Sequence, residues 1–427
     1  MKAVLVHLPG VPWHCLMQDR ATALLPAFLK LIESGASGAC KAIGPHPLMD
    51  GVIATGRAPQ SNGLLTRHEA RADGFGVDLA SACQPGAPAL WQYLDVAGVR
   101  CASVNMLATN FGVLEQGGVV SDAFCEIRAV HFDDWGIPPG AISPLRLAPA
   151  LADFRVHPED LEAAQIAPFL IDEVPDQDQA RPRIVAKILA ENSTAHAAAT
   201  YLLEQEGVDF CAVRYPALAQ LRTAFASAAA RPPGKGAAWG FLRLLDAFLS
   251  RLSELAGPGA TFFVTGGTED APFWIACGPG VAEDVLWPRN TSLYDLAPSL
   301  LALFGFTAEN LSGTVPAGIF ANRQTVPVPA LGTTVPERQS AAVRRVLESL
   351  AASGMPRLGP SKSQQEMLDK QRFRQHFALA ECARLDGRHA DAMIMYSAAL
   401  AVYPEDARAL SGLRHSVRLH DAARKAV

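Results

Sequence analysis

The feature that most constrains this chain is a series of short, uninterrupted apolar runs separated by longer stretches with helical periodicity. The apolar runs lie at 3–8, 99–105, 209–215, 261–265 and 273–277. Runs that are continuous rather than alternating are typical of strands covered on both faces. Helical patterns lie between them, at 21–34, 87–97, 184–205 and 240–255. This order predicts an α/β fold with a doubly wound, mainly parallel sheet, in which residues 3–8 form a central strand.

The net charge and the positions of the cysteines argue against several classes of protein. The 427 residues carry a net charge of −5 and contain no block of Lys and Arg, which argues against a nucleic-acid or membrane-surface partner. No apolar stretch approaches the ~18–20 residues of a membrane-spanning helix. The eight cysteines are scattered and form no Cys-x-x-Cys pair, so neither a disulfide framework nor a zinc knuckle is expected. We expect a cytoplasmic protein.

The chain divides into three predicted parts. Residues 1–325 hold the alternating strand and helix patterns, and 326–372 form a Pro-rich linker with one helix at 337–352. Residues 373–427 are Ala-rich and helical, with the spacing of a tetratricopeptide repeat. That spacing is carried by Leu379, Gly387, Ala392, Tyr396, Ala399 and Pro404. A generic helical hairpin is the alternative interpretation.

A single repeat leaves part of its packing surface uncovered. The helical tail is therefore expected to dock on the α/β part, to pair with a second copy or to bind a protein partner. Pairing or partner binding is favoured, because the segment before the tail is polar. The candidate partner-binding residues are Leu379, Tyr396 and Ala399.

Two segments of the chain resemble known family motifs. Residues 55–64 read Thr-Gly-Arg-Ala-Pro-Gln-Ser-Asn-Gly-Leu, and residues 294–305 read Tyr-Asp-Leu-Ala-Pro-Ser-Leu-Leu-Ala-Leu-Phe-Gly. In this order they resemble motifs of the alkaline phosphatase superfamily, in particular its type I phosphodiesterase/nucleotide pyrophosphatase branch. The resemblance covers about residues 1–325 and implies the doubly wound fold of that family.

The same resemblance implies a site that this sequence does not complete. Family members bind two metal ions, usually zinc, and use a Thr or Ser nucleophile. Here no carboxylate stands at 8–10, and 46–49 contain no Ser, Thr or Cys. No histidine occurs between 197 and 375, where the family places three ligands. We therefore predict no metal site of the family type, and no cofactor.

Two functions remain open. The first is a non-catalytic binding or scaffolding module. The second is a hydrolase or transferase that acts on a phosphate-type ester through a rebuilt site. Zinc or manganese is expected only for the second function. The candidate catalytic residues of the second are His46, Asp50, Thr55 and Arg57. The candidate ligand-binding residues are Asn62, Glu269 and Asp270.

The candidate residues also have structural interpretations. His46 and Asp50 are four residues apart and share one face if their segment is helical. Asp50 also suits the start of a helix, where the macrodipole favours a negative charge, and His46 between two prolines suits a loop. Glu269 and Asp270 suit a solvated turn, and Arg57 a structural ion pair. His14 and Cys15 are expected to point to opposite sides of a strand, which disfavours a thiolate–imidazole pair.

Overall fold

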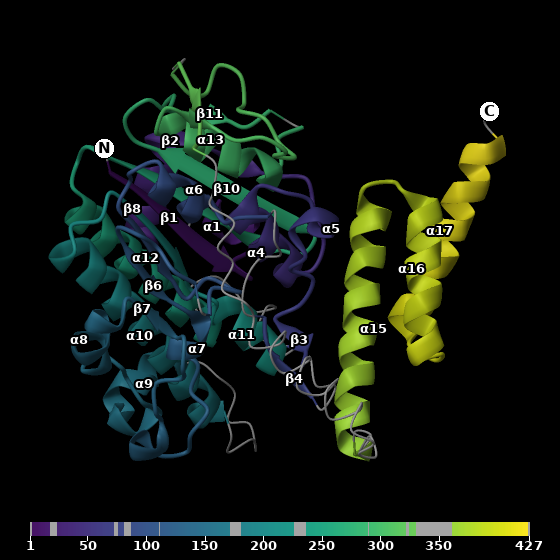
Figure 1. Ribbon diagram of the computed structural model, residues 1–427, viewed down its shortest axis with the longest axis horizontal. Helices are drawn as coiled ribbons and strands as arrows, with labels where there is room; N and C mark the ends of the chain where they lie inside the picture. The colour runs from purple at the N-terminus through teal and green to yellow at the C-terminus, as the bar shows by residue number, and fades with distance from the viewer. Residues whose placement is uncertain are drawn as a thin grey trace, which may run out of the picture.

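The computed structural model (Figure 1) describes the residues 2–17, 24–71, 76–80, 87–110, 112–170, 181–225, 236–288, 290–321, 324–329 and 361–425. The helix expected at 337–352, and with it most of the predicted linker, lies outside the described residues.

A nine-stranded sheet forms the centre of the α/β part, in the order β11-β2-β10-β9-β1-β8-β5-β6-β7. Its strands are β1 (Lys2–Pro9), β2 (Gly35–Ala39), β5 (Cys101–Val104), β6 (Gly118–Val120), β7 (Ile142–Ser143), β8 (Phe210–Arg214), β9 (Ala260–Thr268), β10 (Ala271–Cys277) and β11 (Val285–Leu286). The five strands β9, β1, β8, β5 and β6 run parallel to their neighbours in this group. The predicted central position of residues 3–8 is confirmed, because β1 is the fifth strand of the nine.

Both faces of the sheet are covered by helices, as the continuous apolar runs predict. Val4, Val6 and Leu8 of β1 point into a core shared with α3 (Pro26–Glu33), α10 (Arg181–Gln205) and α12 (Gly236–Ala256). Ala3 and Leu5 point into the opposite core, shared with α4 (His46–Thr55), α6 (Leu90–Val96) and α13 (Leu296–Leu303). The fold is therefore α/β and doubly wound.

Shorter elements complete the α/β part. They are α1 (Trp13–Leu16), α5 (Pro59–Asn62), β3 (His68–Ala70), β4 (Val77–Leu79), α7 (Asp122–Cys125), η1 (Phe132–Asp134), η2 (Leu145–Leu147), α8 (Ala148–Ala152), η3 (Pro158–Asp160), α9 (Ala163–Leu170), α11 (Ala217–Ala224), η5 (Leu293–Asp295), β12 (Phe306–Thr307) and β13 (Val326–Pro327). No helix within the described ranges is long and apolar enough to cross a membrane.

The C-terminal segment consists of three helices: α15 (Lys362–Leu385), α16 (His389–Val402) and α17 (Ala407–Lys425). Gly387 makes the turn between the first two with a φ of +75°, a conformation that glycine adopts at little cost. α15 begins at Lys362, earlier than the predicted tail, because Ser361 and Gln364 form a capping box at its start.

The helical tail docks on the α/β part through α15 (Figure 1). Leu48 of α4 forms a buried apolar cluster with Ala378 and Cys382 of α15. Near the other end of the contact, Gln371 Nε2 donates a hydrogen bond to Thr66 Oγ1 over 2.5 Å. Of the three expected arrangements of the tail, docking on the α/β part is thus the one present within the single chain.

Candidate functional site

A buried polar cluster lies where two parallel strands of the sheet end. His7 of β1 and Arg214 of β8 are direct neighbours in the strand register, and both are almost fully buried. His7 lies on the same face of β1 as Ala3 and Leu5, and this face is covered by α4. The carboxyl ends of parallel strands are where ligands most often bind in open α/β sheets.

Asp50 of α4 joins the two strand residues. Its Oδ1 accepts a hydrogen bond from Arg214 Nε over 2.5 Å and lies 3.5 Å from His7 Nε2. Burial alone would raise the pKa of Asp50, but the neighbouring Arg214 and His7 hold that pKa well below its ordinary value. Asp50 is the fifth residue of α4 and lies outside its first turn, so the interpretation as a charge at a helix start is wrong. Its side chain is only 1% exposed and is a buried ion-pair partner.

His46 is the first residue of α4, one helical turn before Asp50. The predicted shared face is confirmed, whereas the loop interpretation of His46 is wrong. Pro45 and Pro47 do not break the helix, because proline is tolerated at its start, where backbone N–H groups have no partner inside the helix. Burial lowers the pKa of the His46 imidazole to about 4, and nearby Arg214 and Arg222 act in the same direction.

Two buried atoms of this cluster have no hydrogen-bond partner within the described part of the chain. They are His46 Nδ1 and Asp50 Oδ2, whereas His7 Nε2 has its 3.5 Å contact with Asp50 Oδ1. Buried polar atoms are rarely left without a partner in folded proteins, so these two atoms are candidates for contact with water or with a polar ligand.

Asn105 and Asp122 border the cluster, and the sequence patterns did not single them out. Asn105 follows β5 in the left-handed region (φ 56°) and donates from Nδ2 to the Arg214 carbonyl oxygen over 2.9 Å. Asp122 begins α7 and pairs with Arg67 Nε at 3.2 Å. Burial raises the pKa of Asp122, although Arg67 acts in the opposite direction.

Three further candidates serve the loop between α4 and α5 rather than the cluster. Thr55 Oγ1 donates to the Gly51 carbonyl oxygen over 2.7 Å at the end of α4. Arg57 Nη2 donates to the Tyr93 hydroxyl over 2.9 Å. Asn62 is fully buried, donates to the Arg57 carbonyl oxygen and accepts from the Leu64 N–H. With both ends of its amide paired to backbone, Asn62 fixes this loop, and none of the three residues joins the ion pair of Asp50.

Glu269 and Asp270 form the exposed turn between β9 and β10. This position agrees with the interpretation as a solvated turn. The turn follows the carboxyl end of β9, but no hydrogen bond within the described ranges links either side chain to His46 or Asp50.

The tail residues proposed for partner binding are corrected in part. Tyr396 and Ala399 are fully buried inside the three-helix cluster, because α17 covers the face that a lone hairpin would expose. The Tyr396 hydroxyl donates to Glu381 Oε1. Leu379 is half-buried, so among the three candidates it alone keeps an accessible side chain.

The pair His14–Cys15 also differs from expectation. Both residues lie in α1 rather than in a strand, and Cys15 Sγ is 3.5 Å from His14 Nε2. Burial raises the pKa of the Cys15 thiol, which keeps it protonated at neutral pH. The contact therefore exists without the thiolate that nucleophilic chemistry requires.

The two-zinc site implied by the family resemblance does not fit these residues. Leu8 and Pro9 end β1, and Tyr215 and Pro216 follow β8, so the strand ends supply no ligands there. The carboxylates that are present, on Asp50 and Asp122, are paired with arginines. The described ranges contain no group of three or more His, Cys, Asp or Glu side chains arranged to hold a metal ion.

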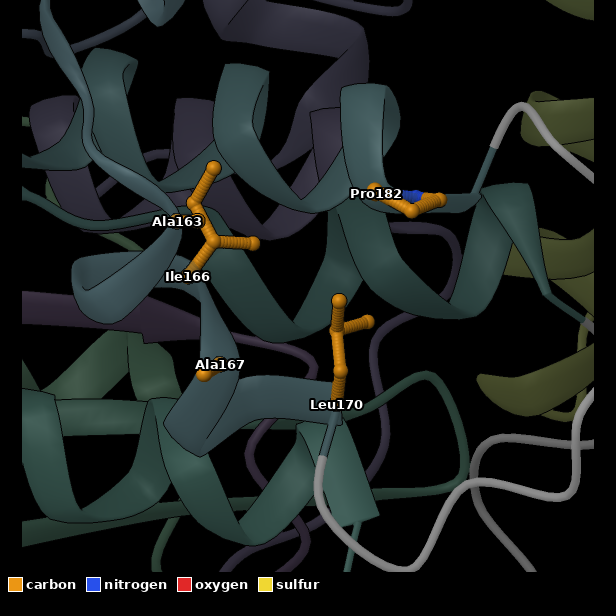
Figure 2. A pocket seen from close by; sticks show the side chains of 5 residues that line it. All are labelled: Ala163, Ile166, Ala167, Leu170 and Pro182. Atoms are coloured by element: carbon orange, nitrogen blue, oxygen red, sulfur yellow. The ribbon is translucent and has the colours of Figure 1, made fainter.

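A separate groove of about 360 Å³ opens between α9 and the start of α10 (Figure 2). Its lining consists of Ala163, Ile166, Ala167, Leu170 and Pro182. These side chains are all apolar, so the groove offers no group for acid–base or nucleophilic chemistry.

No protein-family model and no curated protein matches the chain. Among solved structures, phosphonoacetate hydrolase from Sinorhizobium meliloti matches with 20% identity and a TM-score of 0.37, over 62% of this chain and 55% of its own. Human ectonucleotide pyrophosphatase/phosphodiesterase 5 matches with 10% identity and a TM-score of 0.44, over 74% of this chain and 97% of its own. This chain thus spans about half the length of the phosphonoacetate hydrolase. With TM-scores below 0.5, these overlays do not assign the chain to a family.

Proposed function

We propose that the α/β part is a degenerate member of the alkaline phosphatase superfamily that binds a ligand or partner without catalysing a reaction. The ion pair between Asp50 and Arg214 is the observation that supports a non-catalytic role most directly. The Asp50 carboxylate is buried and bound to the Arg214 guanidinium, so it is not free to act on a substrate. A carboxylate held by a buried guanidinium is a poor general base, because its pKa is far below neutral.

The unpartnered atoms of His46 and Asp50 support a binding role for the same cluster. A polar ligand that reached them would replace missing hydrogen bonds, which the apolar core cannot do. The cluster therefore combines features of a retained binding site with the loss of the family's metal and nucleophile groups.

The test joins elemental analysis of the purified protein with an assay of bis-p-nitrophenyl phosphate hydrolysis in the presence of zinc or manganese. The proposal expects substoichiometric metal and no turnover above background. Metal-dependent hydrolysis that disappears in Asp50→Asn would contradict it, and Asp153→Asn serves as the control because Asp153 is exposed.

The second candidate function is a hydrolase or transferase with a rebuilt site that acts on a phosphate-type ester. The specific observation in its favour is the position of His46, which lies one helical turn before Asp50 and has a buried Nδ1 with no hydrogen-bond partner among the described residues. Two results together would favour this candidate over the binding module. The wild-type protein would hydrolyse the substrate without added metal, and the His46→Gln variant would not.

The tail is proposed as an interaction module with a tetratricopeptide-like helical arrangement, acting on a protein partner or on a second copy. The cytoplasm is the proposed location, since the seven described cysteines are all free thiols.

A further inference from the structure

Helix α17 carries an excess of positive charge, although Arg408 is paired with Asp406 just before the helix at 3.2 Å. Residues 407–425 contain five Lys or Arg and one Asp, a net charge of +4, whereas the whole chain carries −5. The rest of the chain therefore has a net charge of −9. Arg414 and Arg418 are exposed, lie one helical turn apart and repel one another. Within the described residues neither arginine is paired with a carboxylate, so the fold itself does not account for this arrangement.

An acidic surface lies elsewhere on the α/β part, and we define it by five exposed residues: Asp133, Asp134, Glu159, Asp160 and Glu162. Two contacts bring its two segments together. His131 Nδ1 lies 2.8 Å from Glu159 Oε1, and the Phe132 N–H donates to Glu159 Oε2 over 3.2 Å.

Apolar side chains are exposed within the same surface. Val130 is 79% exposed and Phe132 42% exposed, directly beside the acidic residues. Phe132 also packs edge-on against Trp135 and His157, so Val130 is the more accessible of the two apolar side chains.

The basic helix and the acidic surface cannot pair within one chain. The helices α8 and α9, which flank the segment of Glu159 in the sequence, lie at one end of the long axis of the molecule, and α17 lies at the other (Figure 1). Two surfaces of opposite charge at opposite ends of one molecule are complementary between molecules. An antiparallel pair of chains related by a two-fold axis makes this contact twice and closes without free surfaces.

We propose that the exposed face of α17 around Arg414 and Arg418 binds the acidic surface of a second copy of this chain. This inference rests on the proposed role of the tail as an interaction module and names the surface and the occupant. Contacts between exposed charges are individually weak and are screened by salt, so the association is expected to depend on concentration and ionic strength.

The experiment is sedimentation equilibrium of the full chain from about 10 to about 300 µM, at about 50 mM and about 500 mM NaCl. The average mass is expected to rise above the monomer mass of 45.4 kDa at low salt and to return to it at high salt. The variant Arg414→Glu/Arg418→Glu is expected to weaken association at low salt by about tenfold or more. Lys30→Glu/Arg243→Glu is the control, because it changes the net charge equally on another exposed surface.

Mixing two variants with opposite charge reversals tests whether these two surfaces contact one another. The variant Asp133→Lys/Asp134→Lys/Glu162→Lys is also expected to lose self-association, but a mixture with Arg414→Glu/Arg418→Glu is expected to form a complex that neither forms alone. A wild-type protein that stays monomeric at low salt overturns the proposal. So does self-association that both charge reversals leave unchanged, or a monomer that binds phosphatidylserine vesicles through α17. Each outcome is independent of the metal and hydrolysis assays, which test the α/β site alone.

Discussion

Arg214 Nε lies 2.5 Å from Asp50 Oδ1, and this contact joins the end of β8 to the middle of α4 across the carboxyl edge of the sheet. The two residues are 164 positions apart in the chain, and both are buried. The ion pair connects β8 to α4, the two elements that border the buried polar cluster. The ion pair therefore stabilises this edge of the sheet and keeps the Asp50 carboxylate deprotonated.

Replacing Asp50 by Asn is expected to destabilise the protein by about 3–5 kcal/mol, because Arg214 would remain buried without its charge partner. Urea unfolding followed by circular dichroism measures the change. The control Asp153→Asn, at an exposed position, should alter the free energy of unfolding by no more than about 0.5 kcal/mol. Equal stability of the two variants would show that the ion pair does not form.

Three histidines are expected to titrate in two different pH ranges. Burial lowers the pKa of both His46 and His196 to about 4, whereas the hydrogen bond to Glu159 raises the pKa of the exposed His131 above its ordinary value. NMR titration of the imidazole signals should show His131 losing its proton last as the pH rises. A midpoint near 6.5 for His46 would mean that its ring is solvated.

The two lowered pKa values also predict how stability depends on pH. In the unfolded chain both histidines bind protons below about pH 6.5, while in the folded protein His46 and His196 stay neutral down to about 4. Their contribution to the free energy of unfolding is therefore complete above about pH 6.5 and declines as the pH falls towards 4. Urea unfolding at a series of pH values measures this decline, which should be smaller in His46→Gln.

Gly412 of α17 is expected to be essential for the packing of the tail. A Cβ atom at this position would lie 2.3 Å from the ring carbon Cζ of Tyr396, which is itself fully buried. Gly412→Ala should destabilise the tail by about 1–3 kcal/mol through overpacking. The neighbouring Ser411→Ala, on the exposed side, should leave the tail unchanged or slightly stabilised. Calorimetric melting of the full chain compares the two.

Docking of the tail is expected to depend on the apolar contact between Ala378 and Leu48. Ala378→Glu places a carboxylate against a fully buried leucine, so α15 should separate from the α/β part. Hydrogen exchange should then rise at residues 59–70 while α16 and α17 stay protected. Ala401→Glu is the matched control at an exposed position of α16, and the same exchange in both variants would show that this contact does not hold the tail.

The strands with continuous apolar residues were predictable, whereas β2 was not. Its sequence Gly-Ala-Ser-Gly-Ala has little preference for a strand, and its place comes from pairing with β10 and β11. Gly38 also allows Trp287 to pack closely on this strand. Such a strand is defined by its neighbours in space, which periodicity along the chain does not report.

The site was predictable only where its residues are close in sequence. The four-residue spacing of His46 and Asp50 predicted a shared face, and α4 confirms it. His7 and Arg214 were missed because only the strand register makes them neighbours. Their signal was a polar residue at the end of each of two buried apolar runs. Tyr396 was misjudged because the spacing of one repeat shows which residues share a face, but not that α17 packs on this face and buries Tyr396.

The pairing of Asp50 with Arg214 also restricts how this protein can evolve. A chain with a free carboxylate at this edge of the sheet would first have to replace Arg214 or Asp50. Either single step leaves one buried charge uncompensated, at a cost of about 3–5 kcal/mol, a large share of the ~5–15 kcal/mol by which folded proteins are stable. The ion pair therefore resists replacement of either partner alone, and only a simultaneous change of both residues avoids the uncompensated charge.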